Sequence, residues 1–301
     1  MEIKEPAKVA YMFPGQGAQY VGMAKSLYDN HEIARQTINR ADEVLGFSLS
    51  KLMFEGPEKE LTQTRNCQVA IMVASTAALK VHLTQKSEFT PEFALGLSLG
   101  EYTALIAANS MLFQDAVKLT RKRGEYMEEA SEKNPGGMVS IIGLGYDTVR
   151  EIANESGAEV ANLNSPGQIV LSGTAESIKK AADIASKKGA KRAIFLKVSG
   201  AFHSSLMAEA GHRLAKDLEN VAVVAPKIPI VSNVTANSTS NPEDIKQNLI
   251  DQVSTTTHWE ESILRISRNG VKTFLEIGPG NVLKGLLKRI DPNLTCHSIP
   301  A

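Results

Sequence analysis

Cysteine is scarce in this chain, which limits the cellular compartments and the kinds of disulfide or metal site that the sequence allows. The 301 residues include two cysteines, Cys67 and Cys296. Two cysteines do not make a disulfide framework, which favours a reducing cytoplasm. Neither a CxxC nor an HExxH spacing occurs, so we expect no structural or catalytic metal.

Excess charge and long apolar runs are also missing. The 33 basic and 33 acidic side chains give a formal net charge of zero, which leaves no electrostatic footprint for nucleic acid or an anionic membrane. No apolar run approaches the roughly 18 residues of a membrane-spanning helix. Residues 1–5 are too charged for a signal peptide. The sequence thus predicts a cytoplasmic protein without nucleic-acid or membrane partners.

Apolar strand patterns alternate with helical patterns along the chain, which indicates an α/β fold around a parallel sheet. A strand pattern at residues 9–13 ends in a Pro-Gly-Gln-Gly turn. Further strands are expected at 93–95, 228–232 and 272–277. Helices are expected at 22–30, 33–45, 67–85, 101–108, 113–130, 205–218, 242–253, 259–269 and in a short segment that ends at 288.

The turn cluster at residues 134–137 marks a change in this pattern. Strands and helices then follow the order βαββαβ, which is the ferredoxin-like unit. The strands are expected at 138–143, 159–162, 168–172 and 193–198, and the helices at 148–156 and 175–188. We therefore predict a small subdomain of residues 134–198, inserted into a larger subdomain formed by 1–133 and 199–301.

One five-residue stretch carries a strong chemical signal. Gly96-Leu97-Ser98-Leu99-Gly100 lies between an apolar run and a helical pattern, which is the strand–turn–helix context of a nucleophile elbow. The flanking glycines permit a sharp turn that projects the serine hydroxyl. The following helix aims N–H groups at a negative charge that forms beside it. Ser98 is the candidate nucleophile, and the alternative is a buried structural serine.

A serine nucleophile needs a base, and one of six histidines stands where a base is expected. His203 lies at a strand–helix junction, where catalytic side chains of α/β sheets collect. His258 is the second candidate. The other four are expected at the surface, on helices or, for the last, in a C-terminal tail: His31, His82, His212 and His297.

The third member of a hydrolase triad is missing. A hydrolase would place an acid between serine and histidine in chain order, and no acid in the inserted region stands at an obvious strand end. A backbone carbonyl in that role stabilises the imidazolium less than a carboxylate does. The arrangement therefore suits an activated thioester better than an amide.

Two neighbouring features would complete an acyl-transfer site. Oxyanion N–H groups are expected from Leu99 and from Gln16 in the Gly15-Gln16-Gly17 loop, although this loop could also be an ordinary glycine turn. Among the adjacent cations Arg121, Lys122 and Arg123, only one can face inward on a helix. A guanidinium holds a carboxylate by two hydrogen bonds, so an inward Arg123 would select an acyl group that ends in a carboxylate. The alternative is a solvated charged face.

With these residues assembled, the chain resembles the malonyl-CoA:acyl-carrier-protein transacylase family. The resemblance extends from about residue 9 to about residue 289 through six ordered motifs. These are Phe13 to Gln19, Gly96 to Tyr102, Lys122 to Gly124, Asn162 to Gln168, Gly200 to Ser204 and Glu276 to Gly280. It implies an α/β-hydrolase-like large subdomain beside the ferredoxin-like one, with the site in the cleft between them.

The resemblance implies a ping-pong reaction that supplies fatty-acid synthesis. Ser98 would take malonyl from malonyl-CoA, His203 would act as base and then as acid, and Arg123 would hold the malonyl carboxylate. Holo acyl carrier protein would then accept the malonyl group on its phosphopantetheine thiol. No cofactor is implied, because malonyl-CoA is a substrate, and the family leads us to expect a monomer.

Four further residues take roles from the resemblance. The main-chain carbonyl of Gln252 matches the group that orients the histidine. Phe202 is similar to the malonyl-selective members, so methylmalonyl should be a poor substrate. Asn162 and Gln168 match positions near the substrate entrance. Lys191 and Arg192 could meet CoA phosphates, or form an ordinary solvated pair.

The chain departs from the family at two places. Leu97 stands where members usually carry histidine, and we expect activity to be retained. Thr256 and His258 lie in a segment where members often carry Pro-Val-Arg/Gln-Trp, which bears on the loop near Gln252. Three alternatives remain open: a hydrolase of acyl thioesters, a trans-acting acyltransferase of a polyketide pathway, and a carrier-binding module without activity.

Overall fold

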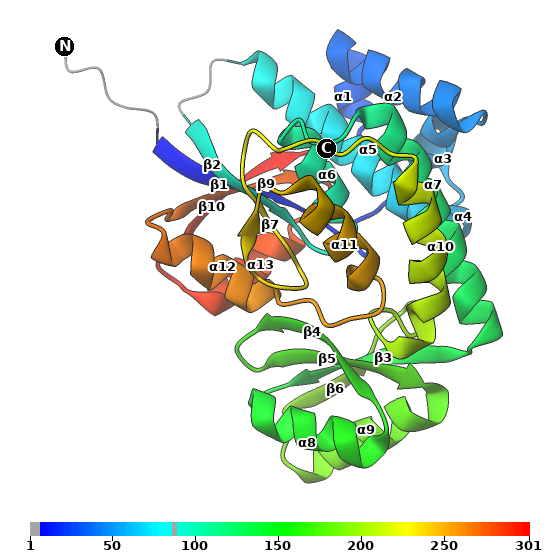
Figure 1. The fold of residues 1–301 in the computed structure, drawn as a ribbon, viewed down its shortest axis with the longest axis vertical. Helices are drawn as coiled ribbons and strands as arrows, with labels where there is room; N and C mark the ends of the chain where they lie inside the picture. The colour runs from blue at the N-terminus through cyan, green and yellow to red at the C-terminus, as the bar shows by residue number, and fades with distance from the viewer. Residues whose placement is uncertain (1–6, 86–88) are drawn as a thin grey trace.

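Two β-sheets of different size organise the chain (Figure 1). The computed structural model describes residues 7–85 and 89–301, so the charged residues 1–5 lie outside the described part. The larger sheet has six strands in the order β10-β9-β1-β2-β7-β8, and the smaller has four in the order β4-β5-β3-β6. The predicted α/β fold with a separate small subdomain is confirmed.

The larger sheet is parallel except at one edge, where β8 runs antiparallel to β7. Its strands are β1 (Ala7–Phe13), β2 (Phe89–Gly96), β7 (Ile230–Val231), β8 (Ser238–Thr239), β9 (Thr273–Gly278) and β10 (Thr295–Pro300). The prediction that His297 lies in a C-terminal tail is wrong, because this residue stands in β10. β10 is a largely polar edge strand and therefore carries little apolar strand pattern.

Helices cover both faces of this sheet. Side chains alternate along β1, so that Val9, Tyr11 and Phe13 join one apolar cluster while Ala10 and Met12 join another. The first cluster includes α5 (Thr64–Thr84), and the second includes α12 (Trp259–Arg268) and α13 (Val282–Ile290). The remaining helices of this subdomain are α1 (Lys25–Asn30), α2 (Glu32–Leu45), α3 (Leu49–Glu55), α4 (Glu58–Leu61), α6 (Gly100–Ala107), α7 (Phe113–Lys133), α10 (Ala208–Glu219) and α11 (Pro242–Gln252).

α5 is the central helix of the larger subdomain. The prediction that no apolar run approaches the length of a membrane-spanning helix is wrong for α5, which is long and apolar enough, but 83% of its most apolar window is buried inside the protein. α5 packs against α7, α2 and β9. The short helices α3 and α4 were not predicted, and residues 205–207 form a 3-10 turn that precedes α10 rather than its first turn.

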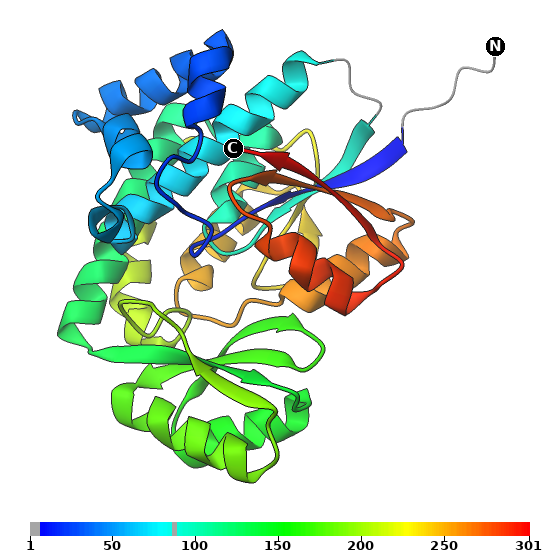
Figure 2. The same cartoon turned by 180° about the vertical axis from the view of Figure 1, so that it is seen from behind.

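The smaller sheet belongs to one continuous segment. Its strands β3 (Gly136–Ile142), β4 (Glu159–Ser165), β5 (Gln168–Thr174) and β6 (Arg192–Phe195) alternate with α8 (Tyr146–Ser156) and α9 (Ala175–Lys187) in the predicted βαββαβ order. All its pairings are antiparallel. Figure 2 shows α8 and α9 on the side turned away from the larger subdomain. The chain boundaries at 133/134 and 198/199 stay a prediction.

Candidate active site

Ser98 lies on the turn between β2 and α6. Its backbone has a φ of 52°, a left-handed conformation that costs energy in a residue with a side chain. The turn is tight, since a Cβ on Gly96 would come within 1.9 Å of the Gly100 carbonyl carbon. A Cβ on Gly100 would come within 2.1 Å of the Phe13 carbonyl oxygen. Only glycine fits at these two positions, and the close packing that it allows holds Ser98 in its left-handed conformation at the carboxyl end of β2.

Asn233, just after β7, holds this turn from the neighbouring strand. Its Oδ1 accepts a hydrogen bond of 2.6 Å from the Ser98 N–H, and its Nδ2 donates one of 2.7 Å to the Gly96 carbonyl. The side chain is fully buried. Sequence reasoning missed Asn233, although its place at the carboxyl end of a parallel strand is a usual position for a functional side chain.

His203 is buried beside the turn, and its ring is held from one side. Its Nδ1 lies 2.7 Å from the main-chain oxygen of Gln252. Because a carbonyl oxygen only accepts, Nδ1 carries the proton and Nε2 is left with its lone pair. Burial lowers the pKa of His203 to about 4, and the nearby charge of Arg123 adds to this effect. The imidazole is therefore neutral at physiological pH.

Two backbone N–H groups near Ser98 remain free of protein partners. Among the described residues, no hydrogen bond uses the N–H of Gln16 or of Leu99. The Gly15 loop lies directly against the elbow, since a Cβ there would come within 2.4 Å of the Leu97 oxygen. Gln16 and Leu99 line the same cavity as Ser98, so their N–H groups are candidates for the donors of an oxyanion hole.

Arg123 reaches the site from α7 and is 1% exposed. Its Nη2 donates to Ser98 Oγ and to Gln252 Oε1, each at 3.0 Å, and its Nη1 donates to Gln68 Oε1 at 2.5 Å. No salt bridge within residues 7–85 and 89–301 involves this guanidinium. Burial lowers the pKa of Arg123. A buried cation with neutral partners favours an incoming anion.

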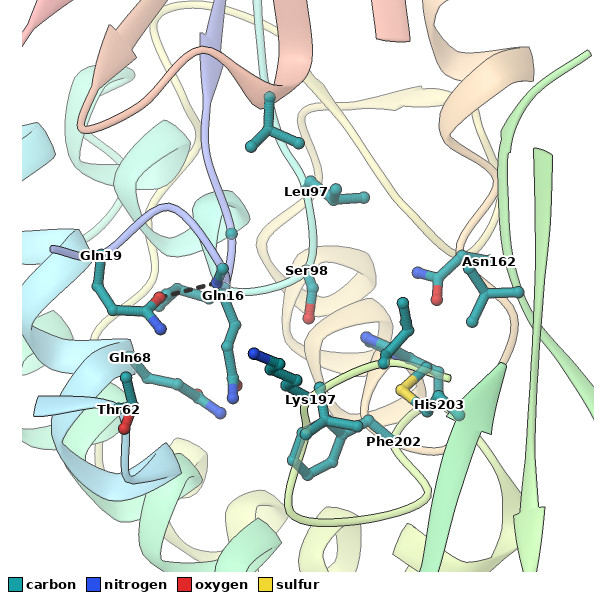
Figure 3. A pocket seen from close by; sticks show the side chains of 18 of the residues that line it. Gln16, Gln19, Thr62, Gln68, Leu97, Ser98, Asn162, Lys197, Phe202 and His203 are labelled. Carbon is teal, nitrogen blue, oxygen red and sulfur yellow. Dashed lines mark hydrogen bonds between the residues drawn. The ribbon is translucent and has the colours of Figure 1, made fainter. Parts of the chain in front are cut away.

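A cavity of about 700 Å³ joins these groups and lies between the two subdomains (Figure 3). From the small subdomain it is lined by Asn162 of β4 and by Gln168 of β5. Asn162 Nδ2 donates to Thr257 Oγ1 at 2.5 Å, and Gln168 Oε1 accepts from Arg289 Nη1 at 2.5 Å. The side chains that bridge the subdomains thus also border the cavity.

The structure brings the predicted site residues together. Eight of them line the cavity, and Gln252 stands behind His203 as its hydrogen-bond partner. The eight are Gln16, Ser98, Leu99, Arg123, Asn162, Gln168, Phe202 and His203. The sequence did not single out Gln68, which holds Arg123, or Lys197, whose side chain extends into the cavity in Figure 3.

Neither His82 nor His258 is among the described residues that line the cavity. The prediction that His82 is exposed is wrong: it is 7% exposed, and its ring meets the Tyr11 ring edge-on at 6.0 Å. α5 is buried nearly all round, so the few polar residues near its end do not mark a solvent face. The second candidate base, His258, is not among the described residues that line the cavity, whereas His203 is. The backbone N–H of His258 donates to the Asn233 oxygen at 2.8 Å.

Leu97 also lines the cavity, and it packs partly against the apolar cluster of α12 and α13. An apolar side chain therefore fits at this position.

The segment before α12, where the chain also departs from the family pattern, is held by hydrogen bonds to the small subdomain. Thr256 Oγ1 donates to the Val160 oxygen at 2.6 Å. Two backbone hydrogen bonds also cross between the subdomains here: the Leu163 N–H donates to the Thr257 oxygen at 2.9 Å, and the Thr257 N–H donates to the Ala161 oxygen at 2.8 Å.

A serine on such an elbow, with a neutral imidazole and two free N–H groups close by, defines a protein of the serine acyl-transfer class. Residues 10–290 match the family described as "Acyl transferase domain". The malonyl CoA-acyl carrier protein transacylase of Bacillus subtilis strain 168 is 44% identical over 293 residues, which cover 96% of this chain and 92% of that protein. The chain belongs to the malonyl CoA-acyl carrier protein transacylase family.

Solved structures agree with this assignment. The acyl-carrier-protein S-malonyltransferase of Burkholderia pseudomallei 1710b superposes with a TM-score of 0.94 at 42% identity, covering 97% of this chain and 96% of that one. A malonyl-transacylase solved in complex with its type II PKS acyl-carrier protein gives a TM-score of 0.94 at 37% identity, with 97% and 96% covered.

Proposed function

We propose that this protein transfers malonyl from malonyl-CoA to the phosphopantetheine thiol of holo acyl carrier protein, and so supplies fatty-acid elongation. Family membership supports the activity. The observation that carries the substrate assignment is the hydrogen bond of 3.0 Å from Arg123 Nη2 to Ser98 Oγ. It sets a buried guanidinium beside the nucleophile, where it can bind a carboxylate that is one methylene away from the reacting carbonyl.

In the first half-reaction, Ser98 Oγ attacks the thioester carbonyl of malonyl-CoA. Nε2 of His203 takes the hydroxyl proton, while Nδ1–H stays on the Gln252 oxygen. The N–H groups of Gln16 and Leu99 stabilise the negative charge on the former carbonyl oxygen. His203 then gives its proton to the departing CoA thiol, and malonyl-Ser98 remains.

In the second half-reaction, the carrier thiol replaces CoA in the cavity. His203 takes the thiol proton, and the thiolate attacks the malonyl ester of Ser98. The same two N–H groups stabilise the second tetrahedral intermediate, and His203 returns its proton to Ser98 Oγ. Because burial lowers the pKa of His203 to about 4, the neutral form that can accept a proton dominates throughout the physiological range.

Selectivity comes from both ends of the acyl group. Arg123 binds the malonyl carboxylate after giving up its contact with Ser98 Oγ. Phe202 is 5% exposed and lines the cavity directly before His203, so its ring crowds an α-methyl group. One methyl group changes recognition by only about 10–200-fold, so methylmalonyl is a poor substrate rather than an excluded one. Asn162 and Gln168 contact the substrate at the entrance.

We further propose that the enzyme acts as a cytoplasmic monomer. A polyketide carrier is a second candidate acceptor, because the malonyl-transacylase with a type II PKS carrier partner is 37% identical to this chain. The hydrolase alternative is disfavoured, since a buried guanidinium beside the serine suits malonyl rather than long acyl chains.

The test is to incubate the protein with radiolabelled malonyl-CoA and locate the label by peptide mapping. Malonyl should appear on Ser98 of the native protein and not on the Ser98→Ala variant. Adding holo acyl carrier protein should discharge the label onto the carrier faster than water removes it. Equal labelling of both proteins would contradict the proposal, and discharge to water alone would indicate a hydrolase.

A further inference from the structure

One buried carboxyl group beside the site has no part in the transfer as described. Glu101 stands on the first turn of α6, three residues after Ser98, and is 2% exposed. Its Oε2 accepts hydrogen bonds from Gln252 Nε2 at 2.5 Å and from the Asn233 N–H at 3.3 Å. Each partner also holds a residue of the site: Asn233 accepts the Ser98 N–H, and the main-chain oxygen of Gln252 binds His203 Nδ1.

Gln252 is the junction through which Glu101 acts. Its main-chain oxygen lies 2.7 Å from His203 Nδ1, and its Oε1 accepts from Arg123 Nη2 at 3.0 Å. Its Nε2 donates to Glu101 and also to the Ser98 oxygen at 3.1 Å. If the amide turned over, Oε1 would face the acceptor oxygens of Glu101 and Ser98, and Nε2 would face the Arg123 donor, so that like groups would repel at both ends. Glu101 therefore acts together with Arg123 and the Ser98 oxygen to fix which way this amide points.

We propose that Glu101 is a positioning residue for malonyl transfer: by fixing the Gln252 amide it holds the carbonyl that orients His203 and the oxygen that orients Arg123. The inference rests on the proposed roles of those two residues. Through Gln252, the Glu101 carboxyl group would position both His203 and Arg123 without contacting either of them.

Charge makes this arrangement sensitive to pH. Burial raises the pKa of Glu101 to about 7, against the opposing field of Arg123 on α7. Lys197 in the cavity lining is a further charged side chain near the site. The other titratable groups of the buried network are Tyr102 on the same helix, whose pKa burial raises to about 12, and His203. Both are neutral near pH 7. Glu101 is therefore the group that changes charge there.

The malonyl carboxylate adds a second negative charge to this pocket when it binds Arg123. An ionised Glu101 opposes that addition, whereas a protonated one still accepts from Gln252 through its carbonyl oxygen. Malonyl-CoA should consequently bind better below the pKa of Glu101 than above it. The KM for malonyl-CoA should rise as the pH increases through about 7.

Two variants separate contact from charge. Glu101→Gln keeps an acceptor oxygen for Gln252 but has no charge, whereas Glu101→Ala removes both. We expect Glu101→Ala to lower kcat by about 10–100-fold through misplacement of His203. Glu101→Gln should keep kcat within about threefold and lose the rise in KM between about pH 6 and about pH 8. CoA phosphates titrate alike with every variant, so a difference between profiles belongs to residue 101.

Glu276→Gln is the matched control. Glu276 is 1% exposed and accepts the N–H groups of Leu283 and Lys284 at the start of α13, each at 2.9 Å. Its variant should lower the thermal midpoint but keep the native dependence of KM on pH. An unchanged kcat in Glu101→Ala, or a native KM profile in Glu101→Gln, overturns the inference. If Glu101→Ala does not fold, the Glu101→Gln profile decides. Native protein that takes no malonyl on Ser98 refutes the proposed function instead.

Discussion

The two sides of the cavity differ in how firmly their polar side chains are held. On the large-subdomain side, the Arg123 side chain makes three hydrogen bonds to buried or half-buried partners, and the Gln252 side chain also makes three. On the small-subdomain side, Asn162 and Gln168 are each held by one side-chain bond, and both of these bonds cross to the larger subdomain. We infer that the large-subdomain side carries out the acyl transfer and that the small-subdomain side contacts the substrate as it enters.

The largest effect should come from the firmly held side, in Ser98→Ala. Without the hydroxyl no acyl-enzyme forms, and the transfer rate should fall by about 10⁴-fold or more. Rapid-quench measurement of malonyl incorporation checks this. Transfer at more than one hundredth of the native rate would show that the serine is not the acyl carrier, and the division between the two sides would lose its basis.

Arg123→Ala should give the next largest loss, and the loss should be selective. We expect kcat/KM for malonyl-CoA to fall by about 10²–10³-fold, the size found when one preorganised hydrogen-bond donor is removed from an active site, while acetyl-CoA is affected far less. Steady-state kinetics with both thioesters measures the ratio. A parallel fall for the two substrates would indicate that Arg123 supports the elbow rather than the carboxylate.

Asn233→Ala should reduce activity and stability together. Two buried hydrogen bonds across the elbow are lost, which should lower the free energy of unfolding by about 1–3 kcal/mol. Acylation should slow by about tenfold because the strained Ser98 conformation loses its support. Urea unfolding and acylation rates measure the two effects. Asn233→Asp keeps the acceptor for the Ser98 N–H and should fall between the alanine variant and the native protein.

Substitution on the other side should give smaller effects of a different kind. Asn162→Ala and Gln168→Ala should raise KM for malonyl-CoA by about 2–10-fold and leave kcat near its native value, as expected for contacts made equally before and during reaction. Initial-rate kinetics separates the two constants. A fall of kcat by about 100-fold in either variant would place the small subdomain within the chemical step and would break the comparison.

The smallest expected effect is that of mild acid on kcat. Because the pKa of His203 is lowered to about 4, the base stays neutral as the pH falls from 7 towards 5.5. We expect kcat at saturating malonyl-CoA to change by less than about twofold over this range. An acid limb near the ordinary histidine pKa of about 6.5 would mean that the imidazole is better solvated than its burial indicates.

His203 should also make stability depend on pH in a definite direction. Its folded pKa of about 4 lies below the unfolded value, so the unfolded chain binds the extra proton first as the pH falls. This residue therefore costs stability progressively between about pH 6.5 and about pH 4, and its cost is absent above that range.

Local patterns were sufficient to predict that Ser98 and His203 lie in one cavity, because each stands where a strand pattern gives way to a helix; the role of His203 as the base stays a prediction. They also predicted the order of the inserted βαββαβ unit. They missed β10, which is polar, and β8, which has two residues. Asn233 and Gln68 went unnoticed for another reason: they act on residues 135 and 55 positions away, and no nearby sequence pattern records such contacts.

The pairing of β3 with β6 has a consequence for how this chain can change. Val139 lies opposite Phe195, so the segment enters and leaves the larger subdomain at neighbouring points. An inserted segment whose ends are adjacent can be exchanged for a related one without moving Ser98 or His203. An exchange at these two points would replace Asn162 and Gln168 in the cavity lining and leave Arg123 and Phe202 of the larger subdomain in place.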